Sequence, residues 1–383
     1  MAITVLGAVS VATWLYLFFG RGGFWRVRPH LAPAARGSQK PSQIVAIVPA
    51  RDEAAVVGTA VRSLLEQHLP VPMRVVLIDD GSSDGTADVA AQSARDAGAG
   101  HRLAILNGKP LPSEWTGKLW AVSQGIEAAR QLEADYYLLT DADIQHDPES
   151  ISRLLSISQS GSFDLASYMV KLSIASAAEK FAIPAFVYFF LQLYPPRWIA
   201  SPHSRAAGAA GGCMLIRPAA LERAGGIAAI RNALIDDCAL ARAVKKTDGK
   251  VWLGLTDESH SIRSYGGFGG VGQMISRSAF HQLHHSTLLL VFTIGGLAVT
   301  YLAPPLLLFS SRSVPMLSGG IAWALMTVSY LPIVRFYRRP ALWALSLPLV
   351  AVFYAGYTVH SAVRFWTGAG GQWKGRVQDT ARR

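Results

Sequence analysis

Apolar residues gather in four long segments, one at the start of the chain and three at its end. Residues 3–19 carry no charge, and the closing segments cover about 287–309, 314–334 and 341–363 with short loops between them. As a helix, the first segment would measure roughly 26 Å at about 1.5 Å per residue, close to the about 30 Å of a hydrocarbon core. Trp25 and several arginines follow this segment rather than precede it, which is typical of a retained anchor and not of a signal peptide. The pattern predicts a membrane anchor at residues 1–25 and about three membrane segments within residues 287–363.

The charges beside these segments are compatible with two membrane topologies. By the positive-inside rule, the arginines after residue 19 place the C-terminal side of the anchor in the cytoplasm. Three full spans at the end of the chain would then put the basic tail, residues 364–383, outside, against the same rule. A break at Ala303-Pro304-Pro305 would make the first of these segments re-entrant and would return the tail to the cytoplasm.

Between the apolar ends, residues 43–286 alternate between strand and helix patterns. Short β-branched or apolar runs predict strands, and helical stretches separate several of them. This alternation indicates an α/β domain on a mostly parallel, doubly wound sheet of Rossmann type. Residues 26–42, rich in Pro, Ala, Gly and Ser, predict a linker in front of the domain. The predicted strands cover residues 44–48, 74–78, 103–106, 136–140, 213–216 and 251–255.

One apolar stretch inside this domain, residues 181–194, is too short to span a bilayer and contains Pro184. It is consistent with a core helix or with a helix that lies in the membrane plane. Pro195, Pro196, Arg197 and Trp198 follow it, and this interfacial composition favours the second interpretation. We therefore expect an interfacial segment at residues 181–199.

Composition supports a membrane protein and argues against a nucleic-acid partner. Hydrophobic residues make up 51% of the 383 residues and charged residues only 16%, less than a soluble domain usually carries. The net charge of +11 comes from Lys and Arg residues that are scattered or lie beside apolar runs, so it fits an anionic membrane surface better than nucleic acid. Cys213 and Cys238 make neither a metal-binding spacing nor a disulfide framework.

Acidic residues stand where two of the predicted strands end. Asp141 and Asp143 follow one strand, and Asp79 and Asp80 close another and lead into a Gly-rich turn. In open α/β sheets ligands bind beyond the carboxyl ends of the strands. Two carboxylates there suit a hard divalent cation that substrate phosphates also hold, and the free N–H groups of the turn suit a base or ribose. The alternative is a solvated acidic turn, and from Asp84 onward a plain turn with an Asp N-cap is at least as good.

Two further groups belong to the same predicted edge of the sheet. Arg51 and Glu53 follow the first strand and would meet the same ligand, with a surface ion pair as the alternative. Asp236 and Asp237 open a predicted helix, where acids also suit the helix dipole without any catalytic role. Lys118 would reach a phosphate or an acidic neighbour.

Taken in order, these motifs resemble those of the family 2 glycosyltransferases of the GT-A fold, over nearly the whole chain. Within this family the chain is most similar to the membrane-bound hopene-associated glycosyltransferases of bacterial hopanoid biosynthesis, and more distantly to ceramide glucosyltransferases. The motifs are Val-Pro-Ala-Arg-Asp-Glu up to Glu53, Asp-Asp-Gly-Ser-Ser-Asp-Gly-Thr from Asp79, Gly117-Lys118, Asp141-Ala-Asp143, the Gly-rich stretch before Cys213, and Asp236-Asp237.

The resemblance implies a role for each acid. Asp80 would contact the nucleotide base, Asp141 the ribose side, and Asp143, together with Asp141, a Mn²⁺ or Mg²⁺ ion that bridges the diphosphate. Asp237 would be the general base that deprotonates the acceptor hydroxyl in an inverting transfer, and Asp236 would orient it or cap the helix. The remaining expected contacts of the nucleotide-sugar are Pro49, Arg51, Glu53, Asp79, Lys118 and Arg277.

The chain departs from processive members of the family after residue 270. These carry Gln-X-X-Arg-Trp, whereas here Gln273-Met-Ile-Ser-Arg277-Ser has one extra residue and no Trp, which favours transfer of a single sugar. Arg263 and Tyr265 are further candidates for the site. His260 is either a third metal ligand or an ordinary loop histidine. The cluster His281, His284 and His285 precedes an apolar segment without matching carboxylates and is interpreted as interfacial.

The sequence therefore predicts a membrane-bound glycosyltransferase of the bacterial inner membrane with its catalytic domain, residues 43–286, on the cytoplasmic side. Its expected partners are a nucleotide-sugar, with UDP as the family expectation, and a hopanoid or other isoprenoid lipid. Polyprenyl phosphate or a sphingolipid-like headgroup are alternative acceptors. A non-catalytic scaffold that keeps the nucleotide-binding domain is the alternative outside the enzymes. A transporter is a weaker alternative, because the closing apolar segments contain no acidic residue that could form a substrate path.

Overall fold

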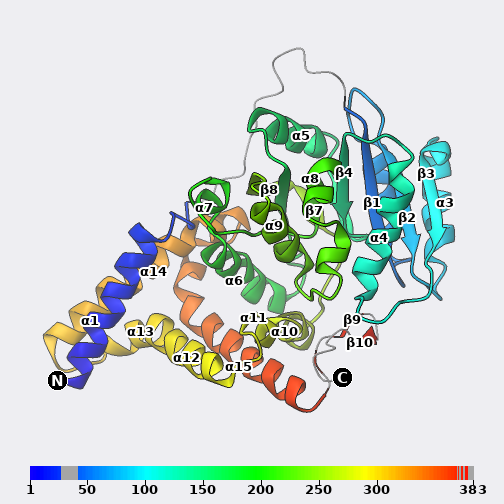
Figure 1. Ribbon diagram of the computed structural model, residues 1–383. Helices are drawn as coiled ribbons and strands as arrows, with labels where there is room; N and C mark the ends of the chain where they lie inside the picture. Colours follow the sequence, from blue (N-terminus) through cyan, green and yellow to red (C-terminus); the bar gives the residue numbers. More distant parts are fainter. Residues whose placement is uncertain (27–41, 369, 371, 374–375, 378–383) are drawn as a thin grey trace.

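Eight strands form one mixed sheet, and long helices extend from one side of it (Figure 1). The computed structural model describes residues 1–26, 42–368, 370, 372–373 and 376–377, so most of the predicted linker and the last residues of the tail lie outside the described part. The strand order is β3-β2-β1-β4-β7-β6-β8-β5. The strands are β1 (Ile44–Ala50), β2 (Arg74–Asp79), β3 (Leu103–Asn107), β4 (Tyr136–Thr140), β5 (Ile144–His146), β6 (Leu165–Lys171), β7 (Cys213–Ile216) and β8 (Val251–Ser261), and β9 (Gln372–Trp373) pairs with β10 (Arg376–Val377).

The mostly parallel α/β architecture predicted from the alternation is confirmed. β3, β2, β1 and β4 pair in parallel, and β6 pairs in parallel with β8. β7 runs antiparallel to both β4 and β6, and β5 runs antiparallel to β8, so the sheet is mixed in its second half. The parallel half brings the carboxyl ends of β1, β2 and β4 to one edge.

Two hydrophobic cores lie on opposite faces of this sheet. Along β1, Val45 and Ile47 face one core, whereas Ile44, Ala46 and Val48 face the other. Strands that are buried on both faces read as unbroken apolar runs, which is why these strands were visible in the sequence. One face is covered by α2, α3 and α5, and the other by α4, α6 and α9. The helices are α1 (Ala2–Leu15), α2 (Val57–Leu65), α3 (Thr86–Asp96), α4 (Gly117–Arg130), α5 (Ser150–Ser160), α6 (Ala177–Leu193), α7 (Pro196–Ala200), α8 (Pro218–Arg223), α9 (Asp236–Lys246), α10 (Phe268–Ser276), α11 (Ala279–Gln282), α12 (Thr287–Leu297), α13 (Ala303–Leu307), α14 (Ser313–Phe336) and α15 (Leu347–Trp366).

The sequence analysis missed β5 and β6 and ended β8 too early. β6 is nearly fully buried in the second half of the sheet but contains Ser167, whose hydroxyl donates to the carbonyl of Trp252. The outer half of β8 is held by β5, a strand of three residues. Both strands are stabilised by pairing with distant segments, which leaves little local signal in the sequence.

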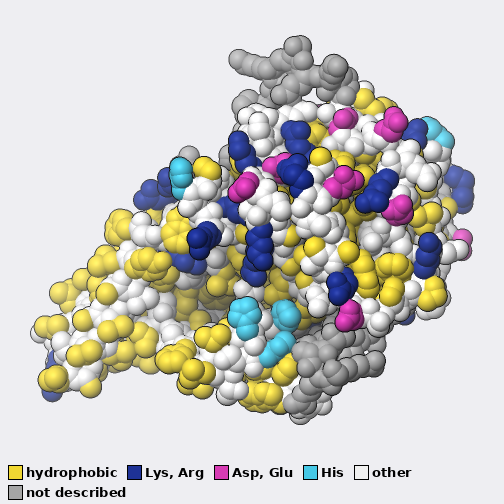
Figure 2. All heavy atoms as spheres, viewed as in Figure 1, with side chains coloured by type: hydrophobic (Ala, Val, Ile, Leu, Met, Phe, Trp, Pro, Cys, Tyr) yellow, Lys and Arg dark blue, Asp and Glu magenta, His cyan; other side chains and the backbone are white. Residues whose placement is uncertain are grey.

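Four helices are long and apolar enough to cross a membrane, by length and composition: Ala2–Gly20, Thr287–Leu307, Ser313–Phe336 and Ala341–Trp366. They match the four predicted segments. The helix that contains Pro304 and Pro305 continues through a π-helical turn, Ala298–Leu302, so the prolines begin α13 and do not open a loop. Figure 2 shows the surface of this helical part as mainly hydrophobic, with Lys and Arg side chains gathered where it meets the sheet domain.

α6 connects the sheet domain to the helical part. A capping box at Ser176 and Glu179 begins the helix, and most of its residues are buried. Tyr188 hydrogen-bonds Ser329 of α14 at 2.7 Å, and Tyr354 of α15 donates to the carbonyl of Ala182 at 3.0 Å. This burial is what the core-helix alternative predicts, and the expected contact of residues 181–199 with a membrane stays a prediction.

α15 packs along α10 and α11, which belong to the predicted catalytic domain. The hydroxyl of Ser276 contacts the ring of His360 at 3.0 Å, and the amide of Phe280 donates to the hydroxyl of Ser361 at 3.1 Å. These contacts bring Arg364, in the last turn of α15, to a cavity beside the sheet. The start of the basic tail therefore lies beside the catalytic domain.

Candidate active site

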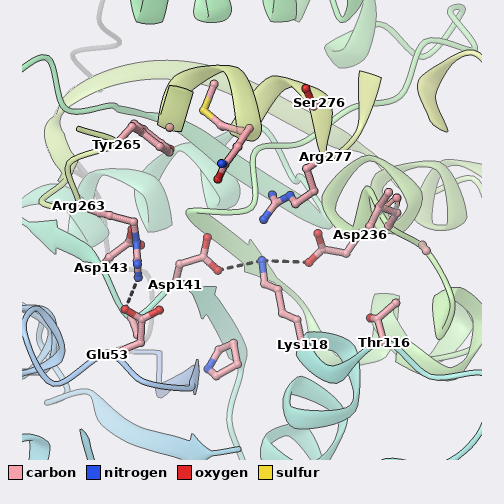
Figure 3. Close-up of a pocket in the computed structure, with 18 of the residues that line it drawn as sticks. Glu53, Thr116, Lys118, Asp141, Asp143, Asp236, Arg263, Tyr265, Ser276 and Arg277 are labelled. Atoms are coloured by element: carbon pink, nitrogen blue, oxygen red, sulfur yellow. Dashed lines mark hydrogen bonds and ion pairs between the residues drawn. The ribbon is translucent and has the colours of Figure 1, made fainter. Parts of the chain in front are cut away.

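A cavity of about 500 Å³ opens at the carboxyl ends of β1 and β4 (Figure 3). The sheet side of its wall is acidic, and the helical side, from α10 and α15, contributes cations. The edge position follows from the parallel half of the sheet, as expected for ligand sites in this class. Its titratable lining residues are Glu53, Lys118, Asp141, Asp143, Asp236, Arg263, Tyr265, Arg277 and Arg364, and Pro49 also lines it.

Lys118 connects two of the predicted acids. Its ammonium nitrogen lies 2.9 Å from the carboxylate of Asp141 and 3.1 Å from that of Asp236, as Figure 3 shows. The lysine is placed by the start of α4, where the hydroxyl of Thr116 caps the helix. Burial would lower the pKa of Lys118, but Asp141 and Asp236 outweigh it and raise that pKa. Burial also raises the pKa of Asp141. Lys118 therefore stays charged and offsets part of the negative charge of Asp141 and Asp236.

Arg263 connects the other two acids. Its Nε donates to Asp143 Oδ2 at 2.9 Å, and its terminal nitrogen pairs with Glu53. Burial opposes the charge of Arg263, yet Asp143 and Glu53 outweigh it and raise the pKa of the guanidinium. Arg263 is the second residue after β8, the strand whose outer half was not predicted from the sequence. Arg263 therefore connects Glu53, in the loop after β1, with Asp143, the carboxylate expected to bind a metal.

The oxygen donors at the cavity fit a divalent cation. Asp141 and Asp143 present carboxylates to one space, the donor type that Mg²⁺ and Mn²⁺ prefer. Within the described residues no cluster of three or more His, Cys, Asp or Glu could hold a metal by itself. His260 pairs with Gln145 in the sheet and does not line the cavity. An ion here would take two carboxylates and draw its other ligands from phosphates and water.

Asp236 and Asp237 lie differently although they are neighbours at the start of α9. Asp236 is on the cavity wall, whereas Asp237 accepts hydrogen bonds from the amides of Gly211, at 2.8 Å, and Cys238, at 2.7 Å. Burial, followed by repulsion from Asp236, raises the pKa of Asp237 to about 6. A Cβ at Gly211 would lie 3.3 Å from Asp237 Oδ2 and 3.5 Å from Lys118 Nζ. Glycine at this position therefore lets both side chains approach the backbone closely, and Asp237, unlike Asp236, does not line the cavity.

The remaining predicted nucleotide contacts lie outside the lining of the main cavity. Arg51 donates to the carbonyl of Asp80 at 2.6 Å and lies 3.7 Å from its carboxylate, which is nearly buried. Asp79 accepts from the amide of Ser82 at 2.9 Å. Asp84 accepts from Ala54 and Thr86, the local role that the plain-turn alternative predicts. Nucleotide contact by Asp79, Asp80 and Arg51 stays a prediction.

Two cations reach the cavity from the helical side. Arg277 follows α10 and points into the space above Lys118 in Figure 3, and Arg364 comes from α15. Neither has an ion-pair partner in the part of the chain that the structure describes. The sequence analysis treated Arg364 only as part of a basic tail. No local pattern signals it, because its place depends on how α15 packs against α10 and α11.

Part of the sheet domain matches a known protein family. Residues 45–224 match the family model described as Glycosyl transferase family 2. Undecaprenyl-phosphate 4-deoxy-4-formamido-L-arabinose transferases of Serratia proteamaculans (strain 568) and Pseudomonas savastanoi pv. phaseolicola (strain 1448A / Race 6) are 32% and 33% identical over 95 residues, 25% of this chain and 26% of each relative. The matched region thus spans about a quarter of the length of these curated relatives.

A solved structure resembles the chain over nearly its full length. Mannosyltransferase PcManGT from Pyrobaculum calidifontis in complex with GDP-Man and Mn²⁺ aligns with a TM-score of 0.58 at 16% identity, over 96% of this chain and 99% of that chain. At this identity the likeness concerns the fold. The matches support the family-level resemblance, whereas its hopene-associated branch stays a prediction. Residues 45–224 of this chain therefore resemble a glycosyl transferase family 2 domain, and the mixed sheet is of the GT-A type.

Proposed function

We propose that the chain is a membrane-bound, inverting glycosyltransferase that moves one sugar from a nucleotide-sugar to a lipid acceptor. The observation that carries this proposal is the two-sided cavity. Its acidic sheet side suits a donor diphosphate with a metal ion. Its cationic side comes from Arg277, which follows α10, and from Arg364, in the candidate span Ala341–Trp366. We place the protein in the bacterial inner membrane with this cavity on the cytoplasmic side.

On the donor side, Asp141 and Asp143 would hold Mn²⁺ or Mg²⁺ and Lys118 would face the diphosphate. A divalent ion supplies charge that offsets the developing charge on a leaving diphosphate. Lys118 is already poised between two carboxylates and can turn toward a phosphate without leaving the cavity. A UDP-sugar is the proposed donor because of the family resemblance.

Two acceptor classes are supported by different parts of the cavity. A hopanoid or related isoprenoid lipid would attack through a hydroxyl, which needs a base, and Asp237, whose pKa is raised to about 6, would supply one. A polyprenyl phosphate would attack through an oxygen that is already ionised and would need cations instead, which Arg277 and Arg364 supply. The names of the curated relatives point to the second class.

The proposal is tested by a donor screen on the full chain purified in detergent. UDP- and GDP-sugars are offered with Mn²⁺ or Mg²⁺, with a hopanoid extract, with undecaprenyl phosphate, or with no lipid, and nucleoside diphosphate release is measured. Release that needs metal and lipid, with one added hexose-sized unit by mass spectrometry, would support the function and identify both substrates. Intact nucleotide binding without release under any condition would favour the scaffold alternative.

Arg364→Gln is expected to raise the KM for a phosphate-bearing lipid about tenfold or more, because a charge-assisted hydrogen bond contributes about 1.5–3 kcal/mol. The KM for the donor should stay unchanged, since the arginine lies on the helical side of the cavity. Steady-state kinetics with each substrate varied separately measures both values. Arg312→Gln, an exposed arginine in front of α14, is the matched control. An equal rise in both KM values would contradict an acceptor role for Arg364.

A further inference from the structure

A second cavity, of about 360 Å³, lies far from the active site, where the anchor helix reaches α7 (Figure 1). One wall comes from the end of the anchor and the turn after it, and the other from α7 and the residue that follows it. Its lining residues are Phe18, Phe19, Gly20, Gly22, Gly23, Arg26, Arg197, Trp198 and Ser201.

The walls of this cavity are fixed by contacts behind them. Trp25 stacks on Phe18 with ring centroids 4.3 Å apart and donates its indole N–H to the carbonyl of Phe18 at 2.8 Å. Arg21 donates to the carbonyl of Gln192 at 3.0 Å. On the other wall, Lys245 donates to the carbonyls of Trp198 and Ser201, at 3.5 and 3.3 Å. The shape therefore does not depend on a ligand.

The polar groups that face this cavity are donors. Arg26 and Arg197 are exposed, none of the described lining residues is acidic, and neither arginine has an ion-pair partner among the residues the structure describes. The indole N–H of Trp198 is a further donor. Gly22 has φ +65°, and a Cβ there would lie 2.9 Å from that indole nitrogen, so only glycine leaves the donor accessible. Such a site takes an anion.

The mouth of the cavity is apolar on the side of the anchor. Tyr16 and Phe19, at the end of the candidate span Ala2–Gly20, are 52% and 68% exposed. A span that ends at the cavity places it at the depth of lipid headgroups. Aromatic side chains at this depth, with arginines beside them, are typical of a membrane interface. The anion that fits this position carries an apolar tail.

We propose that this cavity binds the phosphate of an anionic phospholipid, whose acyl chains lie along the exposed face of α1. Arg26, Arg197 and the indole N–H of Trp198 hold the phosphate, and Tyr16 and Phe19 contact the chains. The bound lipid joins the anchor to the turn at α7 and so fixes the sheet domain against the bilayer. This site is independent of the proposed function, because none of its residues lines the active-site cavity.

The test is thermal unfolding of the full chain in detergent, titrated with dioleoyl phosphatidylglycerol, dioleoyl phosphatidylcholine or inorganic phosphate. Ligands that bind only the folded state raise the melting temperature, and the rise grows with the logarithm of the ratio of ligand concentration to Kd. We expect phosphatidylglycerol to raise it at concentrations where the other two do not. The double variant Arg26→Gln/Arg197→Gln should weaken the apparent affinity about 30-fold, the effect of two arginines near an anionic surface.

Two further variants make the outcome decisive. Trp198→Phe keeps the ring but removes the N–H, so it should weaken the same affinity several-fold. Arg312→Gln removes an exposed arginine from the loop before α14 and should leave the affinity unchanged. Equal protection by inorganic phosphate would overturn the lipid occupant, and an equal loss in Arg312→Gln would show diffuse charge attraction instead of a site. An unchanged affinity in the double variant would also overturn the proposal.

Discussion

Asp143→Asn is expected to lower the rate of sugar transfer about 10³-fold, the size of effect seen when one preorganised electrostatic contact to a transition state is removed. The amide keeps the shape of the side chain but loses the charge that a divalent cation needs. It also removes a partner of Arg263, which would then be held by Glu53 alone. The rate is measured as nucleoside diphosphate release with donor and lipid both saturating.

Asp147→Asn is the matched control for Asp143→Asn. Asp147 is an exposed acid at the end of β5 and does not line the cavity. It should leave the rate and the metal dependence unchanged. In Asp143→Asn, a higher concentration of Mn²⁺ should recover part of the activity, because the ion keeps one carboxylate ligand and the donor phosphates. If the variant kept the rate and metal affinity of the parent protein, Asp143 would not be a metal ligand.

The parts of the fold that the sequence predicted are those with a local physical signal. β4 and β7 were predicted with their observed bounds, since each is a short apolar run buried on all sides and closed by polar or turn residues. β6 was missed because Ser167 interrupts its apolar pattern, and its place depends on pairing with β7 and β8. Long-range pairing of this kind leaves little trace in a short window of sequence.

The site residues also fall into two groups: those with a local signal in the sequence and those whose contacts depend on the fold. Asp141, Asp143 and Asp236 could be found because acids that follow strands or open helices have a recognisable setting, and parallel strands bring them to one edge. Lys118, Glu53 and Arg263 were candidates as well, but which acid each cation pairs with could not be predicted. Lys118 pairs with Asp141 and Asp236, and Arg263 pairs with Asp143 and Glu53, and three of these four pairs join residues more than a hundred positions apart. Gly211 was part of a Gly-rich motif, but only the structure shows that its amide donates to Asp237 and that a Cβ there would crowd the carboxylate.

Asp237→Asn is expected to lower turnover about 10³-fold if the acceptor is a hydroxyl, because general-base catalysis contributes about 10²- to 10⁴-fold. The melting temperature at pH 8 should not fall. Burial raises the pKa of this carboxyl to about 6, so its contribution to stability is present at low pH and is lost as pH rises through 6. The uncharged amide avoids that loss, which separates a catalytic effect from misfolding.

The pH profile of the parent protein follows from the same carboxyl. Below pH 6 the rate should fall about tenfold per pH unit, because the base is protonated, and above pH 6 it should level off. Gly211→Ala should crowd the Asp237 carboxylate and lower turnover, since the added Cβ would lie 3.3 Å from the carboxylate oxygen. Rates measured from pH 5 to pH 9 in the parent protein, in Asp237→Asn and in Gly211→Ala check both expectations.

The pH profile cannot by itself distinguish the two acceptor classes, because the second ionisation of a phosphate monoester also lies near pH 6. The variants can. With a hydroxyl acceptor, Asp237→Asn loses turnover and Asp236→Asn, which frees Lys118 from one carboxylate, mainly changes the KM of the donor. With a phosphate acceptor no base is needed, so Asp237→Asn keeps most of its turnover whereas Arg364→Gln loses acceptor affinity. Comparing these three variants on undecaprenyl phosphate and on a hopanoid alcohol would therefore assign the acceptor from the chemistry of the cavity, whichever lipid reacts faster.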